Sequence, residues 1–173
     1  MSARSPATLH LLVGPVGAGK STWARRRVAR DGGVFLDLDA WMVRLYGGDP
    51  RPPEDRPQDR VAWYLERRAR GQGLLWDVSV EILLAGVDVV LELGLVRRAE
   101  REDTYARARA QDLALVVHAF DAPRSLRRER VAERNACAGP HTQIVPPEFF
   151  ERASDAWEPV TPSERAAWNV VDV

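Results

Sequence analysis

The stretch GPVGAGKS, from Gly14 to Ser21, contains the only lysine of this 173-residue chain. Lysine and arginine together number 25, so every other basic residue is an arginine. The stretch fits the pattern G-x-x-x-x-G-K-[ST], in which glycines let backbone N–H groups turn toward a phosphate without clashes from Cβ atoms. A helix beginning at the lysine would direct its positive end at the same anion. This segment is therefore predicted to be a phosphate-binding loop (P-loop).

Lys20 and Ser21 supply the chemistry of such a loop. We expect the compact ammonium of Lys20 to reach the β- and γ-phosphates of ATP, and the Ser21 hydroxyl to bind Mg²⁺. The planar fork of an arginine is too broad for a tight cradle of backbone, which accounts for a lysine in a chain that otherwise uses arginine. The residues predicted to contact ATP in this segment are Gly14, Pro15, Val16, Gly17, Ala18, Gly19, Lys20, Ser21 and Thr22.

Composition excludes several classes of protein. The formal net charge is zero, so no global field draws the chain to nucleic acid or to a membrane. Cys137 is the only cysteine, which leaves no intrachain disulfide and no cysteine zinc site and suits a reducing compartment. No apolar run approaches the roughly 20 residues of a membrane-spanning helix, and the N-terminal run is too short for a signal peptide. We expect one cytoplasmic domain over residues 1–173, with no membrane partner.

Apolar runs alternate with amphipathic or charged segments along the chain. Strands are predicted at 8–13, 34–39, 86–94, 113–120 and in the final WNVVDV, and helices lie between them. Residues 61–85 are predicted to be helical with a break near Gly71 and Gly73, and the proline-rich segment 48–60 is predicted to be a loop. This alternation predicts an α/β, three-layer P-loop NTPase fold, with a mostly parallel five-stranded sheet covered by helices on both faces.

Five further stretches carry a resemblance to a known family. GAGKSTWAR (17–25), FLDLDAWMVRLYG (35–47), VDVVLELG (87–94), RRAERE (97–102) and FDAPRSLRRERVAERN (120–135) together resemble a family of small bacterial P-loop kinases. Its relatives include the kinase domain of phage polynucleotide kinase, chloramphenicol phosphotransferase and the zeta toxins. The resemblance implies an ATP- and Mg²⁺-dependent kinase. The guanine-reading Asn-Lys-x-Asp signature of GTPases cannot be built without a second lysine.

The resemblance also implies roles for acidic residues. In the family an aspartate just after the second strand accepts the proton of the acceptor hydroxyl, and Asp39 matches this position best, with Asp37 as a second candidate that could act through the metal. The alternative is that either residue only caps a helix starting at Ala40. Glu92 stands where relatives have an aspartate. It could hold Mg²⁺, polarise Ser21, or be a buried acid satisfied by the loop backbone.

Arg130 and Arg134 lie four residues apart and match the arginine pair of the lid in the phage kinase. The resemblance implies that they bind the phosphates of ATP and that Arg134 stabilises the transferring group. A small arginine-bearing lid is accordingly expected at about residues 124–147. Three neighbouring arginines are interpreted as a solvated helix face: Arg124, Arg127 and Arg128.

Arginines are the candidates for binding the molecule that accepts the phosphoryl group. Arg44 is the nearest candidate for a substrate-binding arginine. One of Arg97, Arg98 and Arg101 could meet the substrate, but surface charge is the favoured interpretation of these three. The leading hypothesis is a kinase that phosphorylates a hydroxyl group of a small molecule. The alternatives are a polynucleotide 5′-hydroxyl kinase, which zero net charge disfavours, and an ATP-binding sensor with little transfer activity.

Overall fold

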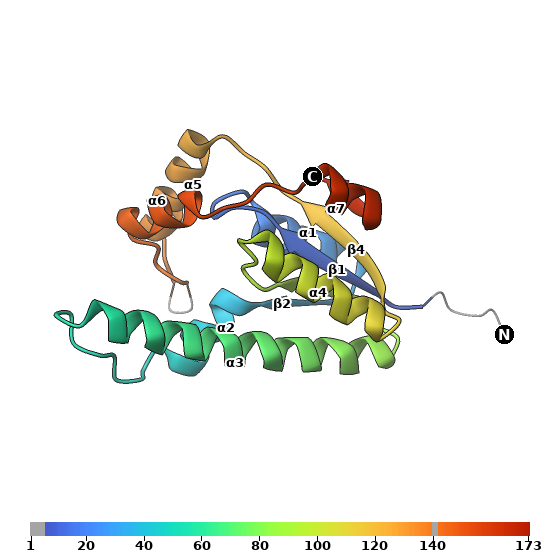
Figure 1. Ribbon diagram of the computed structural model, residues 1–173, viewed down its shortest axis with the longest axis horizontal. Coiled ribbons are helices and arrows are strands. Elements are labelled where there is room, and N and C mark those ends of the chain that lie inside the picture. Colours follow the sequence, from blue (N-terminus) through green and yellow to red (C-terminus); the bar gives the residue numbers. More distant parts are fainter. Residues whose placement is uncertain (1–5, 140–141) are drawn as a thin grey trace.

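Five parallel strands form the central sheet of the protein. The computed structural model describes residues 6–139 and 142–173. The strands lie in the order β2-β3-β1-β4-β5, and all four pairings are parallel. This confirms the predicted α/β fold. Figure 1 labels β1, β2 and β4 of this sheet. The strand bounds are β1 Thr8–Val13, β2 Val34–Asp37, β3 Val89–Glu92, β4 Ala114–Ala119 and β5 Val170–Asp172.

Helices cover both faces of this sheet. On one face, a large apolar cluster joins β1, β3 and β4 to α2, α3 and α4, with Leu75 and Tyr105 fully buried. On the other face, Ala24 of α1 packs with Leu12 and Phe120. The helix bounds are α1 Lys20–Asp31, α2 Leu38–Tyr46, α3 Pro57–Leu84, α4 Arg98–Ala110, α5 Arg124–Ala136, α6 Pro147–Asp155 and α7 Pro162–Ala167.

Strand alternation explains why β1 faces two cores. Leu9, Leu11 and Val13 belong to the large cluster, whereas Leu12 points to α1. Every second side chain of a strand lies on the same face, so an apolar run buried on both faces is the expected sequence of a central parallel strand. In the register with β4, Val13 pairs with Ala119, and the chain leaves β1 directly into the P-loop.

The structure corrects two predicted elements and adds a helix. The second strand ends at Asp37 rather than at residue 39, because α2 already begins at Leu38. Helix α3 continues without a break through Gly71 and Gly73. A Cβ atom on Gly71 would lie 2.9 Å from Cδ1 of Leu38, so this glycine permits the close approach of α3 to α2 rather than ending the helix. The short helix α7 was not predicted.

No helix within residues 6–139 and 142–173 is both long and apolar enough to span a bilayer.

Candidate active site

The P-loop connects β1 to α1 through three glycines with positive φ. Gly14, Gly17 and Gly19 have φ values of 153°, 80° and 101°. A Cβ atom on Gly14 would lie 2.7 Å from the carbonyl oxygen of Phe120, and one on Gly17 would lie 2.7 Å from the carbonyl oxygen of Arg127. Backbone from β4 and α5 therefore approaches the loop so closely that only glycine fits at these two positions.

Lys20 lies buried beneath this loop. Its Nζ atom donates to the carbonyl oxygens of Gly14 at 2.8 Å and Pro15 at 2.9 Å, and lies 3.3 Å from Oε1 of Glu92. The Ser21 hydroxyl donates to Oε2 of the same carboxylate at 3.0 Å. The structure therefore brings together Lys20, Ser21 and Glu92 at the carboxyl end of β3, the edge at which α/β sheets bind ligands.

Asp37 and Asp39 have different environments. Asp37 caps α2, because its Oδ1 accepts the backbone N–H of Asp39 at 3.1 Å and of Ala40 at 3.4 Å. Burial, and then the charge of Glu92, raise its pKa above the usual value. Asp39 lies in the first turn of α2, not on the same strand face as Asp37, and its backbone rather than its carboxylate takes part in the cap.

Asp39 is an exposed residue, but its carboxyl group lies among charged protein groups. Desolvation of the carboxyl group by the surrounding protein, and then the negative charges of Glu92 and Asp37, raise its pKa to about 6, against the opposing effects of Lys20 and Arg134. A carboxyl group with a pKa near neutrality, within the electrostatic reach of Lys20, can take up a proton during a reaction. This environment distinguishes it from Asp37, whose carboxylate is already engaged.

Helix α5 brings two predicted arginines to the site. Nη1 of Arg130 lies 3.9 Å from the position that a Cβ on Gly19 would take, and the charge of Arg134 acts on Asp39. Arg127, however, does not lie on a solvated face. Its guanidinium is buried and donates to the Val16 carbonyl oxygen at 3.0 Å. Arg124 and Arg128 do face outward, and both pair with Glu151 of α6.

Two residues of α3 at the site were not predicted. The charge of Asp39 raises the pKa of Tyr64, after the larger effect of burial, and Arg68 opposes the rise. Arg68 donates to the Gly94 carbonyl oxygen at 2.7 Å and to Glu100 at 3.0 Å, which places it just past the end of β3. The spacing of four residues puts both side chains on one face of α3, but only the packing of α3 shows that this face borders the site.

The remaining arginine candidates lie elsewhere. Arg44 is exposed in the last turn of α2, and no hydrogen bond or ion pair within the described residues holds it at the site. Arg101 is fully buried and pairs with Glu164, so it is not free to meet a substrate. Arg97 and Arg98 are both exposed, and Arg98 pairs with Glu102.

The two histidines of the sheet form a structural pair. Nδ1 of His10 and Nε2 of His118 lie 3.0 Å apart between β1 and β4, beneath the ring of Trp23. Burial is the main cause that lowers both pKa values, that of His118 to about 4, so both rings are neutral near pH 7.

Known structures share this fold. The chain superposes on a candidate kinase from Chloroflexus aurantiacus with a TM-score of 0.71 and 16% identity, covering 98% of this chain and 88% of that one. A shikimate kinase from Acinetobacter baumannii in complex with shikimate superposes with a TM-score of 0.59 and 16% identity, covering 98% of this chain and 84% of that one. A chain of the Pnkp1/Rnl/Hen1 RNA repair complex matches with a TM-score of 0.66 and 16% identity over 96% of this chain. The present chain spans about half of that one, 48%.

Sequence comparisons assign the chain to a family. No curated protein sequence gives a significant match. The model of one protein family, described as an AAA domain, matches residues 9–159 and so includes the P-loop, Asp39, Glu92 and both arginines of α5. The low identities to solved structures establish a shared fold, and the family match covers most of the sequence. The chain therefore belongs to the AAA domain family.

Proposed function

We propose that this protein is an ATP-dependent kinase that transfers the γ-phosphoryl group of ATP to a hydroxyl group of a small molecule. The observation that carries the proposal is the environment of Asp39. Its carboxyl group is accessible, has a pKa raised to about 6, and lies within the electrostatic reach of both Lys20 and Arg134. A nucleotide-binding protein without transfer activity has no need of a proton acceptor there.

In the proposed reaction the acceptor oxygen attacks the γ-phosphorus while the bond to the bridging oxygen of ADP breaks. The proton of the hydroxyl passes to the carboxylate of Asp39. The P-loop N–H groups and Lys20 hold the β- and γ-phosphates, and Arg130 and Arg134 offset the negative charge on the transferring group. Asp37 acts through α2, because it caps the helix that carries Asp39.

The site offers oxygen ligands that suit Mg²⁺. Ser21 and Glu92 place a hydroxyl and a carboxylate side by side, 3.0 Å apart. Over the described part of the chain, no three His, Cys, Asp or Glu side chains are grouped closely enough to hold a metal by themselves. Mg²⁺ usually keeps water and substrate phosphates as ligands, so a site with few protein ligands fits it. Ser21 would hold the ion directly and Glu92 through water, and the bound ion would neutralise phosphate charge.

We propose that residues 124–147 form a lid over the nucleotide within a single kinase-like domain. Helix α5 supplies the two arginines, and Arg124 and Arg128 tie it to α6 through Glu151. Residues 140 and 141 of this segment lie outside the described residues. A lid that carries its arginines on one helix can bring both to the phosphates in one movement.

The acceptor can be found by incubating the protein with γ-labelled ATP and separate pools of metabolites, antibiotics and 5′-hydroxyl oligonucleotides. We expect label to appear in a small molecule. Asp39→Asn should abolish this transfer while ATP binding, measured by calorimetry, is retained. Lys20→Ala should weaken binding itself. If ATP binds but no pool accepts label, the protein is an ATP sensor rather than a kinase.

The oligonucleotide pool tests the second candidate, a polynucleotide 5′-hydroxyl kinase. Two observations favour it: the dense arginines of α5 and the fold shared with a chain of an RNA repair complex. The zero net charge argues against it, because contacts to phosphates dominate affinity for nucleic acid. Label in the oligonucleotides alone would decide for this candidate.

A further inference from the structure

Arg127 of α5 is a buried cation that touches the P-loop from outside. Only 5% of the residue is exposed. Its Nη1 donates to the carbonyl oxygen of Val16 at 3.0 Å and to Oγ of Ser154 at 3.1 Å, and its Nε donates to the carbonyl oxygen of Ala122 at 3.0 Å. The ring of Phe150 lies beneath the guanidinium, with its centroid 5.5 Å from Cζ. Every one of these partners is electrically neutral.

Within residues 6–139 and 142–173, no carboxylate forms an ion pair with Arg127, although its neighbours on α5 are paired. Arg124 binds Asp155 at 2.7 Å and also Glu151, and Arg128 binds Glu151 at 2.8 Å. Burial, followed by the charge of Arg124, lowers the pKa of Arg127, and the more distant carboxylates of Asp121 and Glu151 offset this only in part. A buried charge that only neutral groups contact is costly, and proteins normally pair it. An anion that binds nearby would supply the missing charge.

The P-loop is where such an anion would bind. In a trans peptide the C=O and N–H groups point in opposite directions. Arg127 donates to the carbonyl oxygen of Val16, so the N–H of Gly17 in the same peptide points to the other side of the loop. The hydrogen bond to the carbonyl also polarises that N–H. The backbone of α5 also lies close to Gly17, since a Cβ atom added to Gly17 would lie 2.7 Å from the Arg127 carbonyl oxygen.

We propose that Arg127 is a positioning residue of the nucleotide site, which fixes the Val16–Gly17 peptide and whose buried charge is balanced by the phosphates of the bound nucleotide. This inference rests on the ATP binding of the proposed function, but not on phosphoryl transfer. Because Arg127 also holds Ser154, nucleotide binding is linked to α6. The arrangement predicts that affinity depends on the charge of residue 127 more strongly as the number of phosphates increases.

The test compares three variants by calorimetric titration with ATP, ADP and AMP in the presence of Mg²⁺. Arg127→Gln keeps hydrogen-bond donors but removes the charge, Arg127→Lys keeps the charge, and Arg26→Gln removes a charge from an exposed position of α1. We expect Arg127→Gln to weaken ATP binding by about tenfold or more and AMP binding much less. Arg127→Lys should keep most of the affinity, and Arg26→Gln should bind as the parent does.

The inference is overturned if Arg127→Gln and Arg127→Lys lose the same ATP affinity, or if Arg127→Gln loses as much affinity for AMP as for ATP. Either result would show that the charge of residue 127 does not contribute to binding. If Arg127→Gln does not fold, hydrogen exchange of arginine Nε–H groups in the parent protein provides the test. ATP should slow exchange at Arg127 more than at Arg101, which is as buried but has its own carboxylate. A parent protein that binds no ATP would overturn both proposals, whereas unaltered binding by the Arg127 variants overturns this one alone.

Discussion

Lys20 has an environment that fits an ammonium group closely. Two carbonyl oxygens within 2.9 Å and the carboxylate of Glu92 surround its Nζ, and the residue is only 8% exposed. Arginine would bring a longer, planar group into this space. We expect Lys20→Arg to weaken ATP binding by about tenfold or more, measured by calorimetry. Arg26→Lys, an exposed change on the same helix, is the control. Parent-like affinity of Lys20→Arg would refute the requirement for an ammonium.

Asp39 should make the activity depend on pH. Its pKa in the folded protein is about 6, so the carboxylate that accepts the proton is lost as pH falls through 6. We expect the kcat of the parent to fall about tenfold per pH unit below this value. The measurement is the pH profile of transfer to the acceptor that the labelled pools identify. A flat profile between pH 5 and 7 would exclude Asp39 as the proton acceptor.

The same carboxyl group should reduce stability. The pKa of Asp39 is raised above its unfolded value of 3.8, so the folded state loses stability as pH rises from about 4 to 6, and the loss persists at pH 7. We expect Asp39→Asn to raise the free energy of unfolding at pH 7 by roughly 1 kcal/mol, discounted because water screens this accessible group. Urea unfolding measures it, with the exposed Asp77→Asn as the control. A destabilised Asp39→Asn would contradict the pKa shift.

The sequence predicted Lys20 and Ser21 within the motif and Glu92 outside it, but it did not predict the burial of Arg127. The spacing of GPVGAGKS fixes Lys20 and Ser21, and the end of β3 brings Glu92 to them. Arg127 was predicted to be solvated because an arginine-rich helix usually is. Its burial depends on how α6 packs over α5, and nothing in the local sequence records that contact.

Among the secondary-structure elements, α3 shows that a glycine does not always end a helix. Gly71 and Gly73 predict a break, yet the helix runs from Pro57 to Leu84. A Cβ on Gly71 would lie 2.9 Å from Leu38, whereas a Cβ on Gly73 meets nothing within 4 Å. Packing against α2 therefore accounts for the glycine at position 71, whereas no contact requires a glycine at position 73. The pattern of apolar residues predicted that a helix exists here, but not how far it continues.

The two glycines form a matched pair of sites for substitution. Gly73→Ala should stabilise the protein by about 0.5–1 kcal/mol, because alanine loses less backbone entropy in a helix. Gly71→Ala gains the same propensity, but must displace the Cδ1 methyl of buried Leu38, so we expect it to be less stable than the parent. Urea unfolding of both variants checks this. If both stabilise equally, α3 does not pack on α2 as described.

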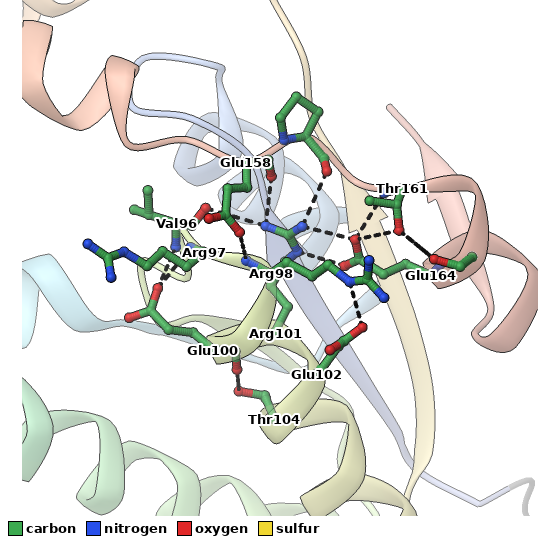
Figure 2. Close-up of polar contacts among 12 residues, drawn as sticks. Val96, Arg97, Arg98, Glu100, Arg101, Glu102, Thr104, Glu158, Thr161 and Glu164 are labelled. Atoms are coloured by element: carbon green, nitrogen blue, oxygen red, sulfur yellow. Dashed lines mark hydrogen bonds and ion pairs between the residues drawn. The ribbon is translucent and has the colours of Figure 1, made fainter.

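At the scale of the whole molecule, a buried arginine joins the C-terminal segment to α4. Arg101 of α4 binds both carboxylate oxygens of Glu164 at 2.8 and 3.0 Å, and donates to the Glu158 carbonyl oxygen at 2.8 Å (Figure 2). The Glu158 N–H donates to the Val96 carbonyl oxygen at 3.1 Å, in the loop that follows β3. The sequence predicted surface charge at Arg101, because its partners lie about 60 residues away.

This pairing predicts a strong asymmetry between single and double substitutions. Arg101→Met leaves the carboxylate of Glu164 buried without its cation, so we expect the free energy of unfolding to fall by about 3–5 kcal/mol. Adding Glu164→Leu removes that unpaired charge and should recover much of the loss. Arg98→Gln, which breaks the exposed pair with Glu102, should cost less than about 0.5 kcal/mol. Urea unfolding measures all three variants. Limited proteolysis of Arg101→Met shows whether the C-terminal segment detaches first, as we expect when its buried ion pair with α4 is lost. A double variant no more stable than Arg101→Met would mean that the neutral hydrogen bonds of Arg101, rather than its charge, hold this segment in place.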